Sequence, residues 1–200
     1  LGTHIGNALE VKDAIDVLAG RTQGDLLEIS LLLGSHMLVL AEKVKTLPEA
    51  RAMLENALSS GAGLRKLAEM IAAQGGDPRV VEDLSLLPQA AVKRVMRAET
   101  AGYLSAMDTT ALGMAAQRMG AGRAKKSDML DYSVGYVLHV RLGDEVTEDT
   151  LLATLYARNE AEAEEAEKAI RKALTIAKEK PQTPKLWDAV VTAEGITYNR

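Results

Sequence analysis

Apolar residues in the first 87 positions recur with the spacing of an α-helix. Val11, Ile15 and Leu18 stand at i, i+4 and i+7, and Gly20 follows as a stop signal. The same signals predict a helix that begins at an Asp25 cap and runs to position 40, and further helices over 47–59 and 64–73, with a short helical turn at 79–82. The helix that ends at position 40 is apolar on nearly all sides, which is typical of a helix buried in a core.

Capping residues mark several helix ends. Thr46-Leu47-Pro48-Glu49 is a capping box with proline in the first turn, where its missing N–H costs nothing. The helix that it begins is expected to end at Gly61. Asp108 is expected to cap a helix over 109–119 and Asn159 a long charged helix over 160–177.

After Pro88 the pattern changes to short β-branched or alternating runs. Strands are expected over 92–98, 102–107, 134–142 and 151–157. An eight-residue connection containing Gly143-Asp144 separates the last two, so they are expected to pair as a hairpin. The tail from Pro181 to Arg200 is expected to be an extended strap or strand. The chain is thus predicted to be α/β (α+β in these residues), with a mostly helical part over 1–88 and a second part over 89–200.

Composition narrows the possible functions. The 200 residues are 47% hydrophobic and carry a formal charge of -4, with 24 Lys and Arg interspersed among 28 Asp and Glu. No basic stripe stands out, which argues against nucleic-acid binding. Cysteine is absent, so no disulfide framework can form, and a cytoplasmic location is expected. The longest apolar stretch, 31–41, is far shorter than the roughly 20 residues of a membrane span, so no membrane partner is expected.

Few residues are candidates for chemistry. His4 could act as a general base, although the sequence shows no partner near it. His36, on the apolar helix, is expected to be a hydrogen-bonded core histidine, and His139 is expected to point to one face of a sheet. The spacing of the three histidines matches no metal motif. Gly120-Ala121-Gly122-Arg123 follows a helix carboxyl end, the negative end of its dipole, and is therefore expected to be a structural turn rather than a phosphate loop.

The first thirteen residues form a glycine-containing helix entry that ends in Asp13. Such a turn can direct backbone carbonyls and one carboxylate at a hard cation, which takes oxygen ligands. The simpler interpretation from spacing alone is a helix entry with Asp13 on a solvated face. Because the chain opens in mid-motif without an initiator methionine, it is expected to be the carboxyl-terminal part of something larger.

Several ordered motifs along almost the whole chain resemble those of the pyrimidine-nucleoside phosphorylase (thymidine phosphorylase) family. They are Gly6-Asn7-Ala8-Leu9-Glu10-Val11-Lys12, Leu33-Gly34-Ser35-His36-Met37, Ala72-Ala73-Gln74-Gly75-Gly76-Asp77, Leu86-Leu87-Pro88, Arg118-Met119-Gly120-Ala121-Gly122-Arg123 and Asp131 through Leu138. The resemblance implies the helical portion of a mixed α/β domain, followed by a small hammerhead-like α/β carboxyl-terminal domain. It also implies a dimeric pentosyltransferase that cleaves thymidine, uridine or deoxyuridine with phosphate as co-substrate, releasing the free pyrimidine and a pentose 1-phosphate.

The resemblance further implies a structural potassium ion held by the carbonyls of Leu1 and His4 and by the carboxylate of Asp13. The family usually has a small residue at the position of His4 and Glu at that of Asp13, so the reach of the shorter carboxylate is in question. The family's Lys-x-Ser-Thr-Gly-Gly phosphate loop and its base-binding Arg, Ser and Lys do not occur in these residues. The chain alone is therefore expected to be inactive and to bind potassium weakly or not at all. The alternative is a free-standing, non-catalytic structural or interaction module.

Overall fold

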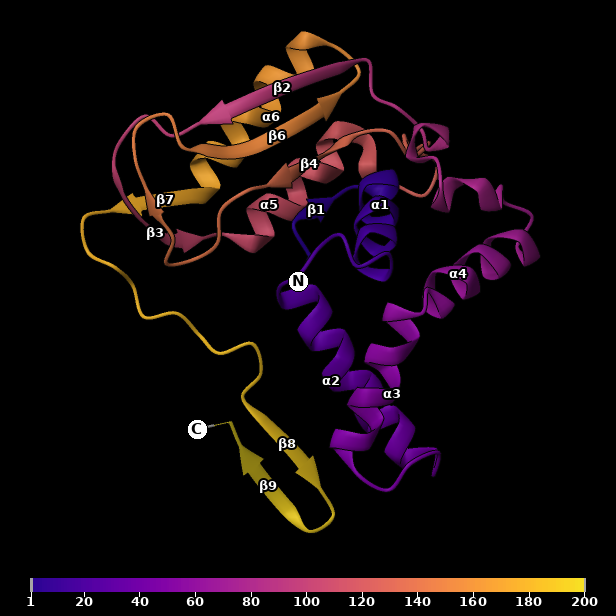
Figure 1. The fold of residues 1–200 in the computed structure, drawn as a ribbon. Coiled ribbons are helices and arrows are strands. Elements are labelled where there is room, and N and C mark those ends of the chain that lie inside the picture. Colours follow the sequence, from indigo (N-terminus) through magenta and orange to yellow (C-terminus); the bar gives the residue numbers. More distant parts are fainter. Residues whose placement is uncertain (1, 200) are drawn as a thin grey trace.

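The computed structural model describes residues 2–199 and begins with a run of helices (Figure 1). The short strand β1 (His4–Ile5) leads into α1 (Asn7–Leu18), α2 (Asp25–Leu40), α3 (Leu47–Ser59) and α4 (Ala62–Ala73), and then into the 3₁₀ turns η1 (Pro78–Val81) and η2 (Leu84–Leu86). The Thr46 hydroxyl accepts a hydrogen bond from the Glu49 N–H at 3.3 Å, which confirms the predicted cap of α3. The helices predicted from apolar periodicity are therefore present.

Helix α2 is much more exposed than its apolar sequence predicts. Leu27 and Leu31 are buried, but Leu33, Met37 and Leu40 are 55%, 68% and 82% exposed. The helix packs along one side on α3, as Figure 1 shows, and no other described element covers the opposite side. The prediction of a buried central helix is therefore wrong for the part of the chain that the structure describes.

The prediction for His36, on the same helix, is also wrong. Its Nε2 atom is buried and has no hydrogen-bond partner among residues 2–199. Ser35 beside it is buried and donates a hydrogen bond to the Leu31 carbonyl at 2.6 Å, one turn earlier. The helix backbone thus satisfies the serine, whereas no described acceptor or donor reaches the imidazole.

The second half of the chain contains antiparallel sheets, so the predicted mixed α/β class is confirmed. The strands are β2 (Val92–Arg97), β3 (Gly102–Met107), β4 (Gly135–Leu138), β5 (Glu145–Val146), β6 (Leu151–Ala157) and β7 (Leu174–Ala177). One sheet has the order β1-β4-β6-β2 and another the order β5-β3-β7. Strands β4 and β6 pair antiparallel, as expected of a hairpin.

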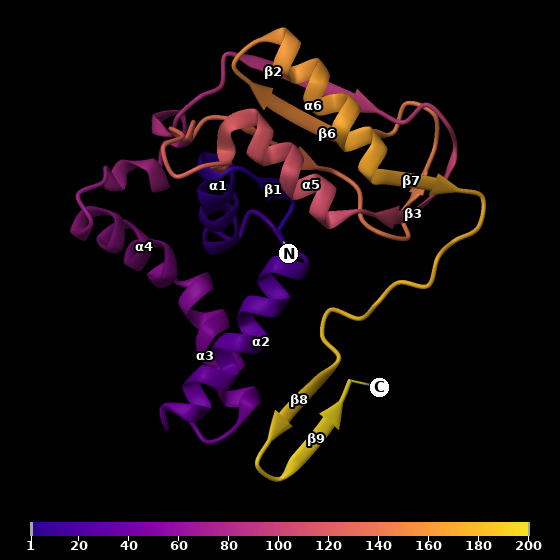
Figure 2. The ribbon, with the colours of Figure 1, turned by 180° about the vertical axis from the view of Figure 1, so that it is seen from behind.

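One face of the four-stranded sheet forms the main hydrophobic core. Two helices, α5 (Thr109–Ala116) and α6 (Glu160–Ala173), cover this face, which is best seen in Figure 2. Because successive side chains of a strand point to opposite faces, Met96, Tyr136 and Leu155 point into the core and are fully buried. The Tyr136 hydroxyl donates a hydrogen bond to the Leu112 carbonyl of α5 at 2.7 Å.

An ion pair between Arg94 and Glu167 fastens α6 to the sheet. Arg94 of β2 donates a hydrogen bond to Glu167 at 2.6 Å, and Arg171 of α6 donates one at 2.9 Å. Burial alone would raise the pKa of Glu167, but these two hydrogen bonds outweigh it and hold the pKa below its ordinary value.

Three predicted boundaries differ from the structure. Helix α6, capped by Asn159 as predicted, ends at Ala173 rather than 177, because Leu174–Ala177 forms β7 beside β3. The strand expected over 134–142 is shorter, Gly135–Leu138. The predicted helix over 109–119 is α5 followed by the π turn η3 (Gln117–Ala121).

The tail adopts extended structure, as expected. It forms the hairpin of β8 (Ala189–Thr192) and β9 (Gly195–Tyr198), which lies apart from the sheets in both ribbon views. Among the described residues, no helix is long and apolar enough to cross a membrane. The predicted division into parts 1–88 and 89–200 stays a prediction.

Candidate functional site

The turn between β1 and α1 packs against the start of β4 through two glycines. Gly6 has φ 134° and ψ 152°, and a Cβ built on it would lie 2.4 Å from the Val134 carbonyl oxygen. Gly135, on the other side of this contact, has φ 147°, and its Cβ would lie 2.1 Å from the Ile5 carbonyl oxygen. Side chains would hold these backbones apart, so glycine at both positions allows the approach.

Hydrogen bonds from the same turn extend this contact. The Ala8 N–H donates to the Tyr132 carbonyl, and the Asn7 side-chain amide donates to the Ala121 carbonyl, both at 3.0 Å. Ala121 belongs to the Gly120-Ala121-Gly122 turn, where Gly120 has φ 104°. That segment is a structural turn, as predicted, and its carbonyl anchors the entry of α1.

The carboxylate of Asp13 points back toward the amino-terminal residues of the chain. Asp13 is only 4% exposed, and its Oδ2 accepts a hydrogen bond from the Thr3 N–H at 3.3 Å. A Cβ on Gly2 would lie 2.4 Å from that same oxygen, so Gly2 leaves room for the carboxylate. The interpretation of Asp13 as a residue on a solvated face is therefore wrong. The site contains a buried carboxylate directed at the turn that carries the predicted carbonyl ligands.

His4 lies against this carboxylate, although the sequence showed no partner for it. Its Nδ1 is 3.4 Å from Asp13 Oδ2 and 2.9 Å from the Thr3 hydroxyl oxygen. Burial lowers the pKa of His4 below its ordinary value, and the charge of Asp13 offsets this only in part. The imidazole is therefore mainly neutral near pH 7 and leaves the negative charge of Asp13 largely uncompensated.

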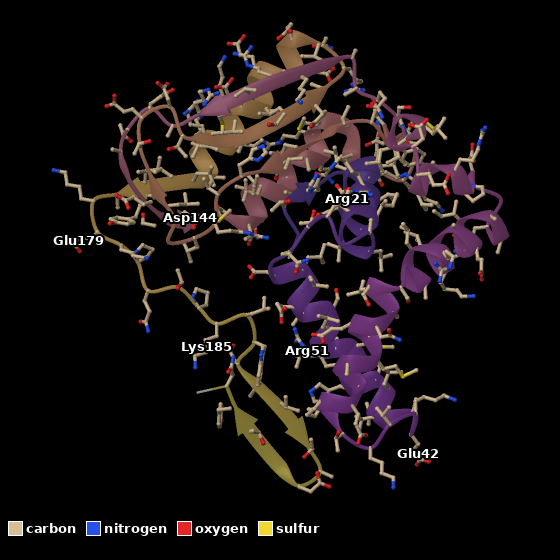
Figure 3. All side chains as sticks on the ribbon, viewed as in Figure 1. Arg21, Glu42, Arg51, Asp144, Glu179 and Lys185 are labelled. Atoms are coloured by element: carbon tan, nitrogen blue, oxygen red, sulfur yellow. The ribbon has the colours of Figure 1, made fainter. Side chains whose placement is uncertain are left out.

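A second carboxylate on α1 is fully paired. Asp16 accepts hydrogen bonds from Lys12 at 2.6 Å and from Arg21, labelled in Figure 3, at 2.7 Å. Burial would raise the pKa of Asp16, but the two cationic donors have the larger, opposite effect and hold the pKa below its ordinary value. Asp16 therefore has its own cations, whereas Asp13 has a neutral imidazole and one backbone N–H.

The three predicted potassium ligands have different outcomes. Leu1 lies outside the described residues. The structure brings the His4 imidazole, rather than its carbonyl, to 3.4 Å from the Asp13 carboxylate, whose oxygens suit a hard cation. Among residues 2–199 no group of three or more His, Cys, Asp or Glu side chains could hold a metal ion. Any cation here would therefore depend on backbone carbonyls.

The other candidate histidine is placed on the sheet. His139 directly follows β4, and its Nε2 lies 2.9 Å from the hydroxyl oxygen of Thr154 in β6. Burial lowers the pKa of His139, and the positive charge of nearby Lys93 lowers it further. The face of the sheet opposite α5 and α6 also carries Lys93, Thr154 and Tyr156. The sequence analysis did not single out these three residues. Strand β2 reads Val-Lys-Arg-Val-Met-Arg without regular alternation, so its pattern gave no signal for Lys93.

The fold and site define a mixed α/β domain of antiparallel strands and helices, with a buried carboxylate at its amino-terminal turn. Residues 103–177 match the family model of the pyrimidine nucleoside phosphorylase C-terminal domain. The chain is 48% identical over 160 residues to the pyrimidine-nucleoside phosphorylases of Geobacillus stearothermophilus and Bacillus subtilis, which covers 80% of this chain and 37% of each relative. It is 42% identical over 177 residues to that of Staphylococcus aureus, covering 88% of this chain and 41% of the relative.

Residues 103–177 therefore form a pyrimidine nucleoside phosphorylase C-terminal domain, and most of the chain is similar to pyrimidine-nucleoside phosphorylases, so the resemblance stated from the sequence motifs is confirmed. The chain spans about two fifths of the length of the curated relatives that it matches.

Proposed function

We propose that this chain works as the carboxyl-terminal part of a pyrimidine-nucleoside phosphorylase. The reaction is the phosphorolysis of thymidine, uridine or deoxyuridine to a free pyrimidine and a ribose or deoxyribose 1-phosphate. The observation that carries the proposal is the 42–48% identity to phosphorylases over most of the chain. We further propose that the complete enzyme is a cytoplasmic homodimer.

In this proposal the chain supplies structure to the active site rather than its reacting groups. Phosphorolysis depends on holding phosphate against the anomeric carbon and on stabilising the charge that develops there. The phosphate loop and base-binding residues that the family resemblance implies do not occur in the 200 residues. The chain alone is therefore expected to release no pyrimidine from thymidine in the presence of phosphate.

A chimera tests the proposed activity. The matching carboxyl-terminal region of the Bacillus subtilis relative would be replaced by residues 1–200 of this chain, and pyrimidine release from thymidine and uridine would be followed with and without phosphate. Phosphate-dependent release by the chimera, and none by the chain alone, is the expected result. A folded chimera without such release would favour the alternative, a non-catalytic structural or interaction module. Turnover by the chain alone would refute its expected inactivity.

We also propose that Asp13, with the carbonyls of Leu1 and His4, contributes to a structural potassium site. Support comes from the buried Asp13 carboxylate, whose Oδ2 faces Thr3 and His4. The ion would neutralise that buried charge and fasten the amino-terminal turn to α1, because burying an unpaired charge is costly.

The potassium site is tested by melting the chimera in KCl and in NaCl at equal ionic strength. A ligand that binds only the folded state raises the melting temperature, so KCl is expected to give the higher value. Asp13→Asn is expected to abolish the difference, whereas Asp188→Asn, in the tail, is expected to preserve it. Equal melting temperatures in the two salts for the unmodified chimera would exclude a potassium-selective site.

A further inference from the structure

The face of the four-stranded sheet opposite α5 and α6 carries a cavity of about 650 Å³. In Figure 1 this face is turned toward the viewer, and no described helix lies in front of β2 and β6. The cavity extends from β1 and α1 across β4 and β6 to β2. Its volume falls within the range of small-molecule sites, roughly 300–1,000 Å³.

Strand register explains which side chains reach this cavity. His4 pairs with Val137, Val137 with Thr154, and Thr154 with Val95, so these four residues form one row across the sheet. In the next row Gly135 pairs with Tyr156 and Tyr156 with Lys93. Since residues directly opposite each other share a face, both rows line the outer surface. Gly135 carries no side chain and leaves space beside the Tyr156 ring.

The lining of the cavity is cationic and contains no carboxylate among the described residues. Lys12, Lys93 and Arg141 contribute the positive charges, with His4 and His139 between them. Lys12 is paired with Asp16, a carboxylate that it shares with Arg21. Lys93 is exposed, forms no ion pair with any residue of 2–199, and places its ammonium 5.8 Å from the centroid of the Tyr156 ring. Lys93 therefore supplies positive charge on the β2 side of the cavity, at the opposite edge of the sheet from His4 and the Asp13 carboxylate beside it.

Polar groups on the cavity floor are fixed in place. Thr154 is only 5% exposed, and its hydroxyl lies 2.9 Å from His139 Nε2. Holding a hydroxyl and an imidazole together in this way costs no further ordering when a ligand arrives. Fixed polar groups beside an exposed ammonium suit a compact anion with several acceptor oxygens.

We propose that this outer face, centred on Lys93, His139, Thr154 and Tyr156, binds a phosphate group, either as inorganic phosphate or as a small phosphate monoester. Lys93 supplies the opposite charge. The hydrogen-bonded Thr154–His139 pair has one donor left, the Thr154 hydroxyl or the His139 Nδ1–H according to the tautomer, and this donor bonds a phosphate oxygen. The Tyr156 ring offers an apolar surface for the carbon part of an ester. The site lies within this chain and does not depend on the proposed phosphorolysis.

The test measures direct binding to residues 1–200. Inorganic phosphate, ribose 5-phosphate and neutral ribose are titrated separately, and the amide NMR shifts of the protein report binding. Phosphate or its ester is expected to give saturable shifts confined to residues around 93, 139, 154 and 156, weakened by added NaCl. Ribose is expected to give none. Comparing the two phosphate ligands distinguishes the possible sources of the group. Tighter binding of ribose 5-phosphate would show that the sugar contacts the Tyr156 ring, whereas tighter binding of inorganic phosphate would identify the free anion as the ligand.

Matched lysine variants make the test specific. Lys93→Met keeps most of the side-chain length and removes the charge, and it is expected to weaken phosphate binding about tenfold because a charge-assisted contact is lost. Lys43→Met makes the same change beside Glu42, which Figure 3 places at the far end of α2, and is expected to leave binding unchanged. Lack of saturable binding, or equal weakening by both variants, would overturn the proposal whether or not the chimera is active.

Discussion

Gly6→Ala tests the close contact between the β1–α1 turn and β4. Gly6 has φ 134° and ψ 152°, a region used essentially only by glycine and costing other residues about 1–3 kcal/mol. Its Cβ would also lie 2.4 Å from the Val134 carbonyl oxygen, and overpacking of this kind costs about 1–3 kcal/mol. The two effects together are expected to lower the free energy of unfolding by about 2–6 kcal/mol.

Urea unfolding followed by circular dichroism measures this change, and amide exchange locates it. The Leu138 N–H donates to the Thr3 carbonyl at 2.8 Å, so its protection from exchange is expected to fall when β1 separates from β4. Gly113→Ala is the control, because Gly113 lies in α5 with no atom within 4 Å of its built Cβ. Alanine there is expected to stabilise by about 0.5–1 kcal/mol. A Gly6→Ala protein within about 0.5 kcal/mol of wild type would refute the close-contact argument.

Three smaller changes test other parts of the fold by urea unfolding. Asn159→Ala removes the side-chain amide oxygen that accepts the Glu162 N–H at the start of α6 and is expected to cost about 1 kcal/mol; an unchanged midpoint would contradict the capping role. Tyr136→Phe removes the buried hydrogen bond to Leu112 and is expected to lower the free energy of unfolding by about 1 kcal/mol; an unchanged free energy would show that this bond does not stabilise the fold. Glu167→Gln weakens the link to Arg94, which is 38% exposed, so about 1 kcal/mol is expected. Because the folded pKa of Glu167 is lowered, this difference should be complete above about pH 4.3 and shrink as the pH falls through the folded pKa; a pH-independent difference would contradict it.

Local signals in the sequence were sufficient to predict most helices and strands. The capping box at Thr46 specifies a helix start through neighbouring residues alone, and the structure has that helix. The end of α6 is different, since its charged, alanine-rich pattern continues past Ala173 without a break. Pairing with β3 turns Leu174–Ala177 into a strand, and that partner lies about 70 residues away, beyond any local pattern.

The site could be predicted only in part, for a similar reason. A family resemblance singled out Asp13 and His4, but periodicity did not show that they touch. Their contact depends on a turn that Gly2 and Gly6 allow, and on the docking of that turn against Gly135 far along the chain. The exposure of α2 was not predicted, because an apolar sequence favours burial but does not specify which element covers it. In the structure, no described element covers the side of α2 opposite α3.

The contacts of the amino-terminal turn determine how the proposed cation site would move. Asn7 is bonded to Ala121, Ala8 to Tyr132, and β1 to β4, so residues 3–8 are attached to the sheet domain rather than to α2, α3 and α4. The Asp13 carboxylate in turn accepts a hydrogen bond from Thr3. Any displacement of the sheet would therefore carry Thr3 and His4 with it, whereas α1 also packs on α4 through Ile15. A bound cation holds all of its oxygen ligands within bonding distance at once, so the proposed potassium ion would add a second link between this turn and α1, beside the hydrogen bond from Thr3 to Asp13.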